Sequence, residues 1–196
     1  MAAENGYDVQ IDEIERPGDS IYEGTVEEIA VEDLPEPQAL EEAKAEDALA
    51  DEGVAAQSAI GAKAVQIARG QAGVVESGGE DCGVPLERYT RHFGKGLQHL
   101  PWCAFFVSWA FDEAGQRPPW RNPGSVRSIH EWAQAQGRLV SQPAHGDIFG
   151  RNDMEHTGLV AGANPAAGQI FTIEGNYSDK VGSRLMSTGG LWFARL

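Results

Sequence analysis

Hydrophobic residues follow a helical spacing in the first part of segment 57–196 and a strand-like spacing in the second part. Leu86, Tyr89 and Phe93 recur at the intervals of three and four residues that mark one helix face. The pattern predicts helices over about 57–72, 84–94, 102–115 and 125–136. It then predicts short strands over about 147–150, 157–162, 169–174, 181–187 and 191–195, with hairpin turns at 164–168 and 188–190. Helices followed by a run of short strands indicate an α+β fold, in which N-terminal helices cover one side of a small antiparallel sheet.

The predicted helix at 102–115 is apolar on every side and carries a cysteine in its first turn. Pro101 marks the start of the helix, because proline is tolerated in the first turn, where its missing N–H costs no hydrogen bond. Cys103 therefore lies among the unpaired N–H groups, whose positive partial charge favours a thiolate and suits a nucleophile. The alternative is that Cys103 is simply a small buried hydrophobe, since free cysteine is among the most buried residue types.

Polar residues near the ends of the later strands provide partners for a nucleophilic thiol. His156 stands at the start of one predicted strand, and Glu174 and Asn176 at the end of the next. A thiol nucleophile needs a base to take its proton, and the base needs a third group to orient it. Glu174 and Asn176 are two residues apart on a predicted strand, so we expect both side chains on one face, within reach of the imidazole.

These motifs, in this order, resemble the CHAP domains, the cysteine- and histidine-dependent amidohydrolases/peptidases related to the papain-like NlpC/P60 cell-wall hydrolases. The segments that carry the resemblance are Pro101–Trp109, Gly146–Phe149, His156–Val160 and Glu174–Asn176. Val65–Val74 is similar to the helix that opens such domains. The resemblance covers about residues 57–196 and implies a papain-like, NlpC/P60-like fold.

The resemblance implies a peptidoglycan hydrolase that cuts an amide bond through an acyl-enzyme, as an N-acetylmuramoyl-L-alanine amidase or a peptide endopeptidase. It implies Cys103 as nucleophile and His156 as general base and then acid. Glu174 would orient the imidazole, with Asn176 as further polar support. Gln98, five residues before the cysteine, is a candidate oxyanion donor. The candidates for contact with substrate are Trp102, Trp120 and Arg151.

Two other functions remain open from the sequence. The chain is alternatively a structural or adaptor component of a phage or injection particle, in which the CHAP-like domain serves as a wall-binding module. A third possibility keeps the thiol chemistry but uses an amine in place of water as acceptor, which gives a transpeptidase or a protein-modifying enzyme. Peptidoglycan is the expected partner both of the hydrolase and of the wall-binding module.

The remaining cysteine and histidines do not predict a metal or cofactor site. Cys82 has three interpretations: a buried structural thiol, which we favour, a partner of Cys103 on oxidation, or a surface residue. His130 falls within a predicted helix, so we expect an ordinary surface or packing role for it, and His145 precedes a strand, so we interpret it as structural or substrate-facing. No Cys/His cluster has zinc-ligand spacing, and the acidic stretch 76–81 lacks the alternating ligands of a calcium loop. We therefore expect no cofactor and no metal.

Acidic side chains are concentrated in the N-terminal quarter of the 196-residue chain. Residues 1–52 carry 18 acidic and two basic side chains, whereas 53–196 carry 12 acidic and 13 basic, so the first segment accounts for the net charge of −15. We interpret 1–37 as an acidic extended arm that is disordered or docks on a protein assembly, 38–56 as a helical connector, and 57–196 as the CHAP-like domain. Nucleic acid is not an expected partner, because phosphate binding needs clustered Lys and Arg.

The sequence shows no secretory signal and no apolar stretch long enough to span a membrane. A protein that acts on the cell wall then needs another route out of its cell. We expect a phage virion, or release to the wall by a non-Sec route.

Overall fold

The computed structural model describes residues 7, 9–15, 27–28 and 59–196, and it has the α+β organisation predicted from the sequence. Its α-helices lie close to the predicted ranges: α2 (Ala59–Arg69), α3 (Val84–Arg91), α4 (Cys103–Glu113) and α5 (Val126–Ala135). Two short 3-10 helices are added, η1 (Ile11–Glu13) and η3 (Pro165–Ala167).

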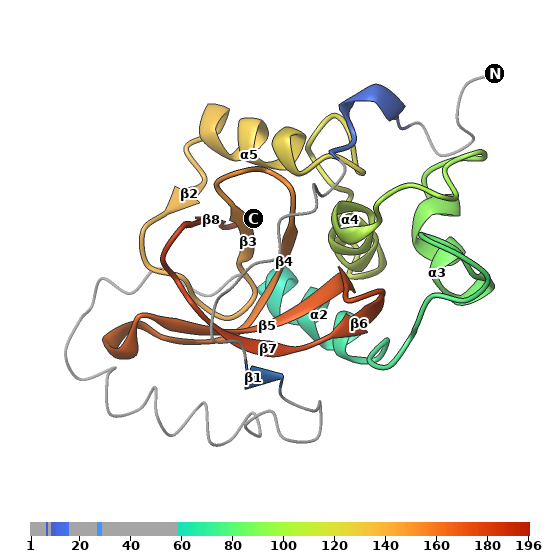
Figure 1. Cartoon of the computed structure of the whole chain (residues 1–196). Helices are drawn as coiled ribbons and strands as arrows, with labels where there is room; N and C mark the ends of the chain where they lie inside the picture. Colours follow the sequence, from blue (N-terminus) through green and yellow to red (C-terminus); the bar gives the residue numbers. More distant parts are fainter. Residues whose placement is uncertain (1–6, 8, 16–26, 29–58) are drawn as a thin grey trace.

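The strands form one antiparallel sheet, in the order β1-β7-β5-β4-β3-β8-β2, and β6 pairs with β5 beside this path. Their bounds are β1 (Glu27–Glu28), β2 (Leu139–Val140), β3 (Ile148–Arg151), β4 (Thr157–Asn164), β5 (Gln169–Tyr177), β6 (Lys180–Gly182), β7 (Arg184–Ser187) and β8 (Leu191–Ala194). Helices α2 and α4 contact the central strands β4 and β5, and Figure 1 shows both helices beside this part of the sheet. The chain segments around β4, β5 and α4 therefore meet at the centre of the domain.

One of the two predicted hairpin turns is confirmed and the other is wrong. The turn at 164–168 joins β4 to β5, which pair with each other, and Gly168 closes it in the left-handed conformation (φ 61). The turn at 188–190 does not join paired strands. β7 pairs with β5, whereas β8 pairs with β3 and β2, because the curved sheet in Figure 1 brings the chain from one side of the central pair to the other.

The core is built around α4, whose first nine residues are all buried. A helix that is apolar on every side can be stable only when other elements surround it, which explains why α2, α3 and the sheet all contact it. Small residues allow these close contacts. A Cβ on Gly175 of β5 would lie 2.5 Å from the Cβ of Phe106, and a Cβ on Gly61 of α2 would lie 2.3 Å from the carbonyl oxygen of Gly146. Larger side chains at these glycines would push α4 and α2 away from the sheet.

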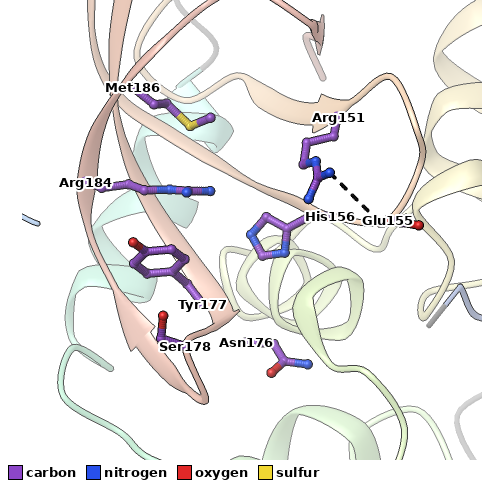
Figure 2. Close-up of a pocket in the computed structure, with 8 residues that line it drawn as sticks. All are labelled: Arg151, Glu155, His156, Asn176, Tyr177, Ser178, Arg184 and Met186. Atoms are coloured by element: carbon purple, nitrogen blue, oxygen red, sulfur yellow. Dashed lines mark ion pairs between the residues drawn. The ribbon is translucent and has the colours of Figure 1, made fainter. Parts of the chain in front are cut away.

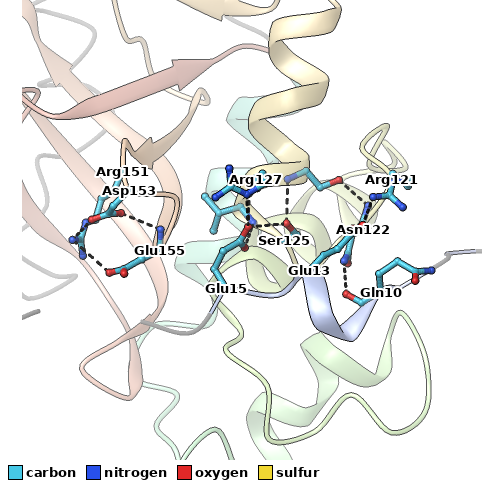
Figure 3. A network of polar contacts seen from close by, with 12 residues as sticks. Gln10, Glu13, Glu15, Arg121, Asn122, Ser125, Arg127, Arg151, Asp153 and Glu155 are labelled. Atoms are coloured by element: carbon cyan, nitrogen blue, oxygen red, sulfur yellow. Dashed lines mark hydrogen bonds and ion pairs between the residues drawn. The ribbon is translucent and has the colours of Figure 1, made fainter. Parts of the chain in front are cut away.

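The described part of the N-terminal segment lies against the start of α5. Tyr7 and Ile14 are buried in the core cluster. The Glu15 carboxylate accepts hydrogen bonds from the Ser125 hydroxyl (3.1 Å) and from the Val126 (3.1 Å) and Arg127 (3.3 Å) backbone N–H groups, and it ion-pairs with the Arg127 side chain. Figure 3 shows this network at the end of the helix. Glu15 therefore satisfies N–H groups that the first turn of a helix leaves unpaired.

The rest of the predicted arm and the predicted connector at 38–56 lie outside the described residues. Strand β1 is the one other described part of the arm, and it pairs with β7, so that Glu28 lies opposite Arg184. Among the described residues, no helix combines the length and the hydropathy that a membrane span requires.

Candidate functional site

Helix α4 and strands β4 and β5 bring three of the predicted site residues together. Cys103 begins α4, His156 immediately precedes β4, and Glu174 lies in β5. The His156 Nε2 atom is 2.6 Å from Glu174 Oε2, and the imidazole also forms a hydrogen bond with the Cys103 thiol. The predicted meeting of a cysteine, a histidine and a carboxylate therefore occurs at the junction of the helix and the sheet.

Glu174 is fully buried and is bound mainly by an arginine that the sequence analysis did not identify. The Nε and Nη2 atoms of Arg184 donate to the two carboxylate oxygens at 2.7 and 2.9 Å, and the Thr172 hydroxyl donates to Oε1. Arg184 is itself only 5% exposed. A buried carboxylate requires such a partner, because an unpaired charge in the interior is strongly unfavourable. One feature of the sequence could have identified Arg184: it is the single cationic residue in 181–187, and it follows closely after Glu174, which lies on an apolar strand.

The contacts in this cluster shift the pKa values of both His156 and Glu174. Burial alone would lower the pKa of His156, but hydrogen bonds with Cys103 and Glu174 outweigh burial and raise that pKa to about 9. Burial alone would raise the pKa of Glu174, but the hydrogen bond with His156 and the charge of Arg184 lower it to about 2. At neutral pH the imidazole is therefore positively charged and the carboxylate negatively charged.

A small pocket of about 190 Å³ opens beside His156, as Figure 2 shows. It is lined by Arg151, Glu155, His156, Asn176, Tyr177, Ser178, Arg184 and Met186. Three of these side chains are cationic at neutral pH, and Arg151 forms an ion pair with Glu155 at the rim. Cys103 is only 4% exposed, and it is not among the described residues that line the pocket. The pocket therefore offers a ligand cationic and polar side chains but not the thiol.

Asn176 does not support the imidazole as predicted. Its Nδ2 atom donates to Asp81 Oδ1 at 2.9 Å. The prediction assumed a regular strand, in which residues 174 and 176 share a face. The pairing of β5 with β6 shifts register after Glu174, and Asn176 has a positive φ of 58. The asparagine side chain is thereby turned from the imidazole toward the loop that carries Asp81.

The tryptophans expected to contact substrate are in the core instead. Trp102 is fully buried, stacks on Tyr89 and donates its indole N–H to Glu76 (2.8 Å). Trp120 is 2% exposed and donates to the Ser108 hydroxyl (2.9 Å). A buried indole needs a polar partner for its N–H, and each of these two has one inside the protein.

The other two candidates, Arg151 and Gln98, have different positions. Arg151 ends β3 and lines the pocket beside His156. Gln98 is half-buried in the loop between α3 and α4 and is not among the described residues that line this pocket. The structure thus brings Arg151, but not Gln98, to the candidate site.

Cys82 is half-buried rather than buried, and both cysteines are free. Its sulfur lies 2.8 Å from Nδ1 of His99, and burial together with Glu76, Asp81 and Glu87 raises the pKa of the Cys82 thiol. This thiol therefore lacks the electropositive surroundings that favour a reactive thiolate. Within the described part of the chain, no three His, Cys, Asp or Glu side chains are grouped as a metal site would require.

Comparison with known proteins gives one structural likeness. No protein-family model matches the chain, and a search among curated proteins finds no match. Among solved structures, the chain is similar to RipD from Mycobacterium tuberculosis, with 21% sequence identity and a TM-score of 0.45 over 70% of this chain and 97% of RipD. RipD is described as a non-catalytic NlpC/p60 domain protein, with an adaptation to peptidoglycan-binding function.

The structure to which the chain is similar is thus described as non-catalytic, and the expectation of a cysteine amidase or endopeptidase is corrected. The site itself provides a physical reason for the correction. A nucleophile must reach the carbonyl carbon of its substrate, whereas Cys103 is nearly fully buried and lies outside the pocket lining. The order of motifs in the sequence identified three residues that are in contact in the structure, but it did not show which of them is accessible to a ligand.

Proposed function

We propose that this chain is a peptidoglycan-binding domain that holds stem-peptide carboxylates in the pocket beside His156 and does not cut the wall. This is the wall-binding alternative raised by the sequence. The observation that carries the proposal is the composition of the pocket: three cationic side chains line it beside one carboxylate and several polar groups, whereas the Cys103 thiol is nearly fully buried outside the lining. The resemblance of the motifs to cell-wall domains supplies the class of ligand.

The charge of the pocket supports an anionic ligand group. Arg184 and Glu174 neutralise each other, and His156 adds a further positive charge because its pKa is about 9. Arg151 brings a guanidinium to the rim, where two carboxylates, those of Asp153 and Glu155, pair with it. A carboxylate placed between Arg151 and His156 gains charge-assisted hydrogen bonds from the guanidinium, which are stronger than neutral ones. The imidazolium adds electrostatic attraction only, because its N–H groups are bonded to Glu174 and Cys103. The peptide stems of peptidoglycan carry such carboxylates, whereas its N-acetylated sugars are neutral.

Sedimentation with purified insoluble peptidoglycan tests this function directly. We expect the full chain to pellet saturably with the wall, to bind more weakly as salt rises, and to release no soluble fragments detectable by mass spectrometry. Arg151→Gln should weaken binding by about tenfold, the value of one charge-assisted hydrogen bond. The matched control is Arg91→Gln, which changes an arginine that is 62% exposed on α3 and pairs with Glu87.

Two results would overturn the proposal. The first is a chain that stays in the supernatant at every wall concentration. The second is release of wall fragments by the unchanged chain but not by Cys103→Ala, because that difference would establish hydrolysis through the thiol. Thermal melting of each variant separates loss of binding from loss of folding.

A further inference from the structure

We propose that Asp81 holds Asn176 so that the amide oxygen of Asn176 accepts a hydrogen bond from a peptide N–H of the bound ligand. This inference rests on the proposed binding function and specifies its ligand: the pocket recognises the stem peptide, by one N–H donor next to a carboxylate. The Asn176 side chain bonds to Asp81, and Asp81 is not among the described residues that line the pocket. Asp81 is a positioning residue, and Asn176 is the contact.

The chemistry of the Asp81–Asn176 pair fixes which way the amide faces. An ionised carboxylate can only accept hydrogen bonds, so the Asn176 atom 2.9 Å from Asp81 Oδ1 must be the NH2 group. The amide oxygen is therefore the atom that Asn176 can offer to the pocket that it lines. In Figure 2, Asn176 lies at the edge of this pocket, below His156 and across from Ser178.

Asp81 can perform this role because its loop is fixed on both sides. Its backbone N–H donates to Glu76 Oε2 (2.7 Å), and Glu76 Oε1 accepts from the indole of Trp102, which immediately precedes α4. On the other side, the loop pairs with the start of β6: the Glu76 N–H donates to the Asp179 carbonyl (2.8 Å) and the Val181 N–H to the Val74 carbonyl (2.7 Å). A hydrogen-bonded chain thus runs from the start of α4 to the end of β5.

Both residues of the pair also have unusual backbones. Asp81 has a φ of 52 and Asn176 a φ of 58, the left-handed region that only glycine, asparagine and aspartate adopt readily. Asp81 is buried, with an exposed fraction of 6%, although its side chain is a carboxyl group. The side chains of these two residues, both in the left-handed conformation, are joined by the hydrogen bond between them. Such conformations persist where the surrounding structure fixes them, which is frequent in binding sites.

The rest of the pocket indicates why the donor belongs to a peptide. Arg151 and His156 face the same pocket and favour an anion, while the Asn176 oxygen favours a hydrogen-bond donor. A ligand that satisfies both the cationic side chains and the Asn176 oxygen carries a carboxylate close to an N–H group. This is the arrangement of a peptide with an acidic side chain or a free C-terminus. A neutral sugar chain offers hydroxyl donors but no anion.

Isothermal titration of the full chain with the soluble stem tetrapeptide L-Ala-γ-D-Glu-L-Lys-D-Ala tests this inference. The peptide is compared with analogues that carry a methyl group on one amide nitrogen at a time. We expect one methylation to weaken binding by about fivefold, the value of one neutral hydrogen bond. In Asn176→Gly, which keeps a residue suited to the positive φ, the unmethylated peptide should bind about fivefold more weakly and the methyl effect should disappear.

A swap variant tests the role of Asp81 separately. Asn176→Asp alone places two carboxylates face to face and should lose binding. Asp81→Asn combined with Asn176→Asp restores a hydrogen bond between the positions and again leaves an oxygen toward the ligand. We expect this double variant to recover both the binding and the methyl effect. A purely structural role of Asp81 would change the affinity of all peptides equally and leave the ratio between methylated and unmethylated peptides unchanged.

The outcomes separate this inference from the proposed function. If the chain sediments with peptidoglycan but the methyl effect persists in Asn176→Gly, the inference is wrong and the binding function stands. If chitotetraose binds and the tetrapeptide does not, the pocket recognises the sugar chain. The inference and the stem-peptide part of the proposed function are then both wrong, and only binding to the wall stands. If the chain does not sediment with the wall and no peptide binds, both are wrong.

Discussion

Arg184→Met should destabilise the domain by about 4 kcal/mol, because it removes the counter-charge of a buried carboxylate. Glu174 is fully buried, and Arg184 donates two hydrogen bonds to it. Breaking a buried ion pair by removal of one partner costs roughly 3–5 kcal/mol, since the other charge is left in the interior. The guanidinium also lies 4.2 Å from the centre of the Tyr177 ring, a contact that contributes up to about 1 kcal/mol. Methionine fills the volume without adding a charge.

Urea unfolding followed by tryptophan fluorescence measures this loss. Arg127→Met is the matched control, because Arg127 is 59% exposed and its ion pair with Glu15 is 3.7 Å long, so we expect a change below about 0.5 kcal/mol. Glu174→Gln together with Arg184→Met should cost less than the sum of the two single changes, since the double variant leaves no buried charge from this pair. A loss below about 1 kcal/mol for Arg184→Met, or additive losses, would refute the buried-charge argument.

Two further predictions concern the imidazole and the N-terminal segment. The folded pKa of His156 is about 9 against 6.5 for an unperturbed histidine, so its contribution is full below pH 6.5 and is lost as pH rises toward 9. Unfolding free energies at pH 6 and pH 9.5 should differ by up to about 3 kcal/mol, and His156→Gln should remove most of that difference. Glu15→Gln should lower the unfolding free energy by about 1 kcal/mol through the weaker cap on α5; an unchanged melting temperature would show that this segment does not cap the helix in solution.

Most elements of the fold could be predicted from local patterns. The predicted helices and four of the five predicted strands of 57–196 lie within a few residues of the observed ones, because apolar spacing and glycine or proline punctuation are local signals. The fifth predicted strand, 181–187, is in fact two strands, β6 and β7, and β2 was not predicted. Serine at position 125 caps α5 as such a signal suggests, with its hydroxyl accepting from the Ser128 N–H. The partner of β8 could not be predicted, because strand order depends on how the whole sheet curves.

The candidate site was predictable only in part, for a related reason. Cys103, His156 and Glu174 could be linked because each lies near the end of an element that packs against the same core. The predicted position of Asn176 was wrong because a register shift and a positive φ interrupt the strand after Glu174. Neither feature produces a periodic pattern of apolar residues that the sequence would show. Arg184 and Asp81 were missed because their roles come from burial beside a particular partner, which is a property of the tertiary structure.

The same core packing that brings the cysteine to the histidine also removes the cysteine from solvent. Helix α4 must be enclosed because it is apolar on all sides, and its first residue is enclosed with it. The Trp102 indole and the Glu76 carboxylate join the start of this helix to the loop that carries Asp81, and that loop is in turn bonded to Asn176 at the pocket. The covered thiol and the positioned amide are therefore parts of one hydrogen-bonded unit. In the proposed function, recognition depends on side chains that line the pocket, among them His156, Arg151 and Asn176, and not on Cys103.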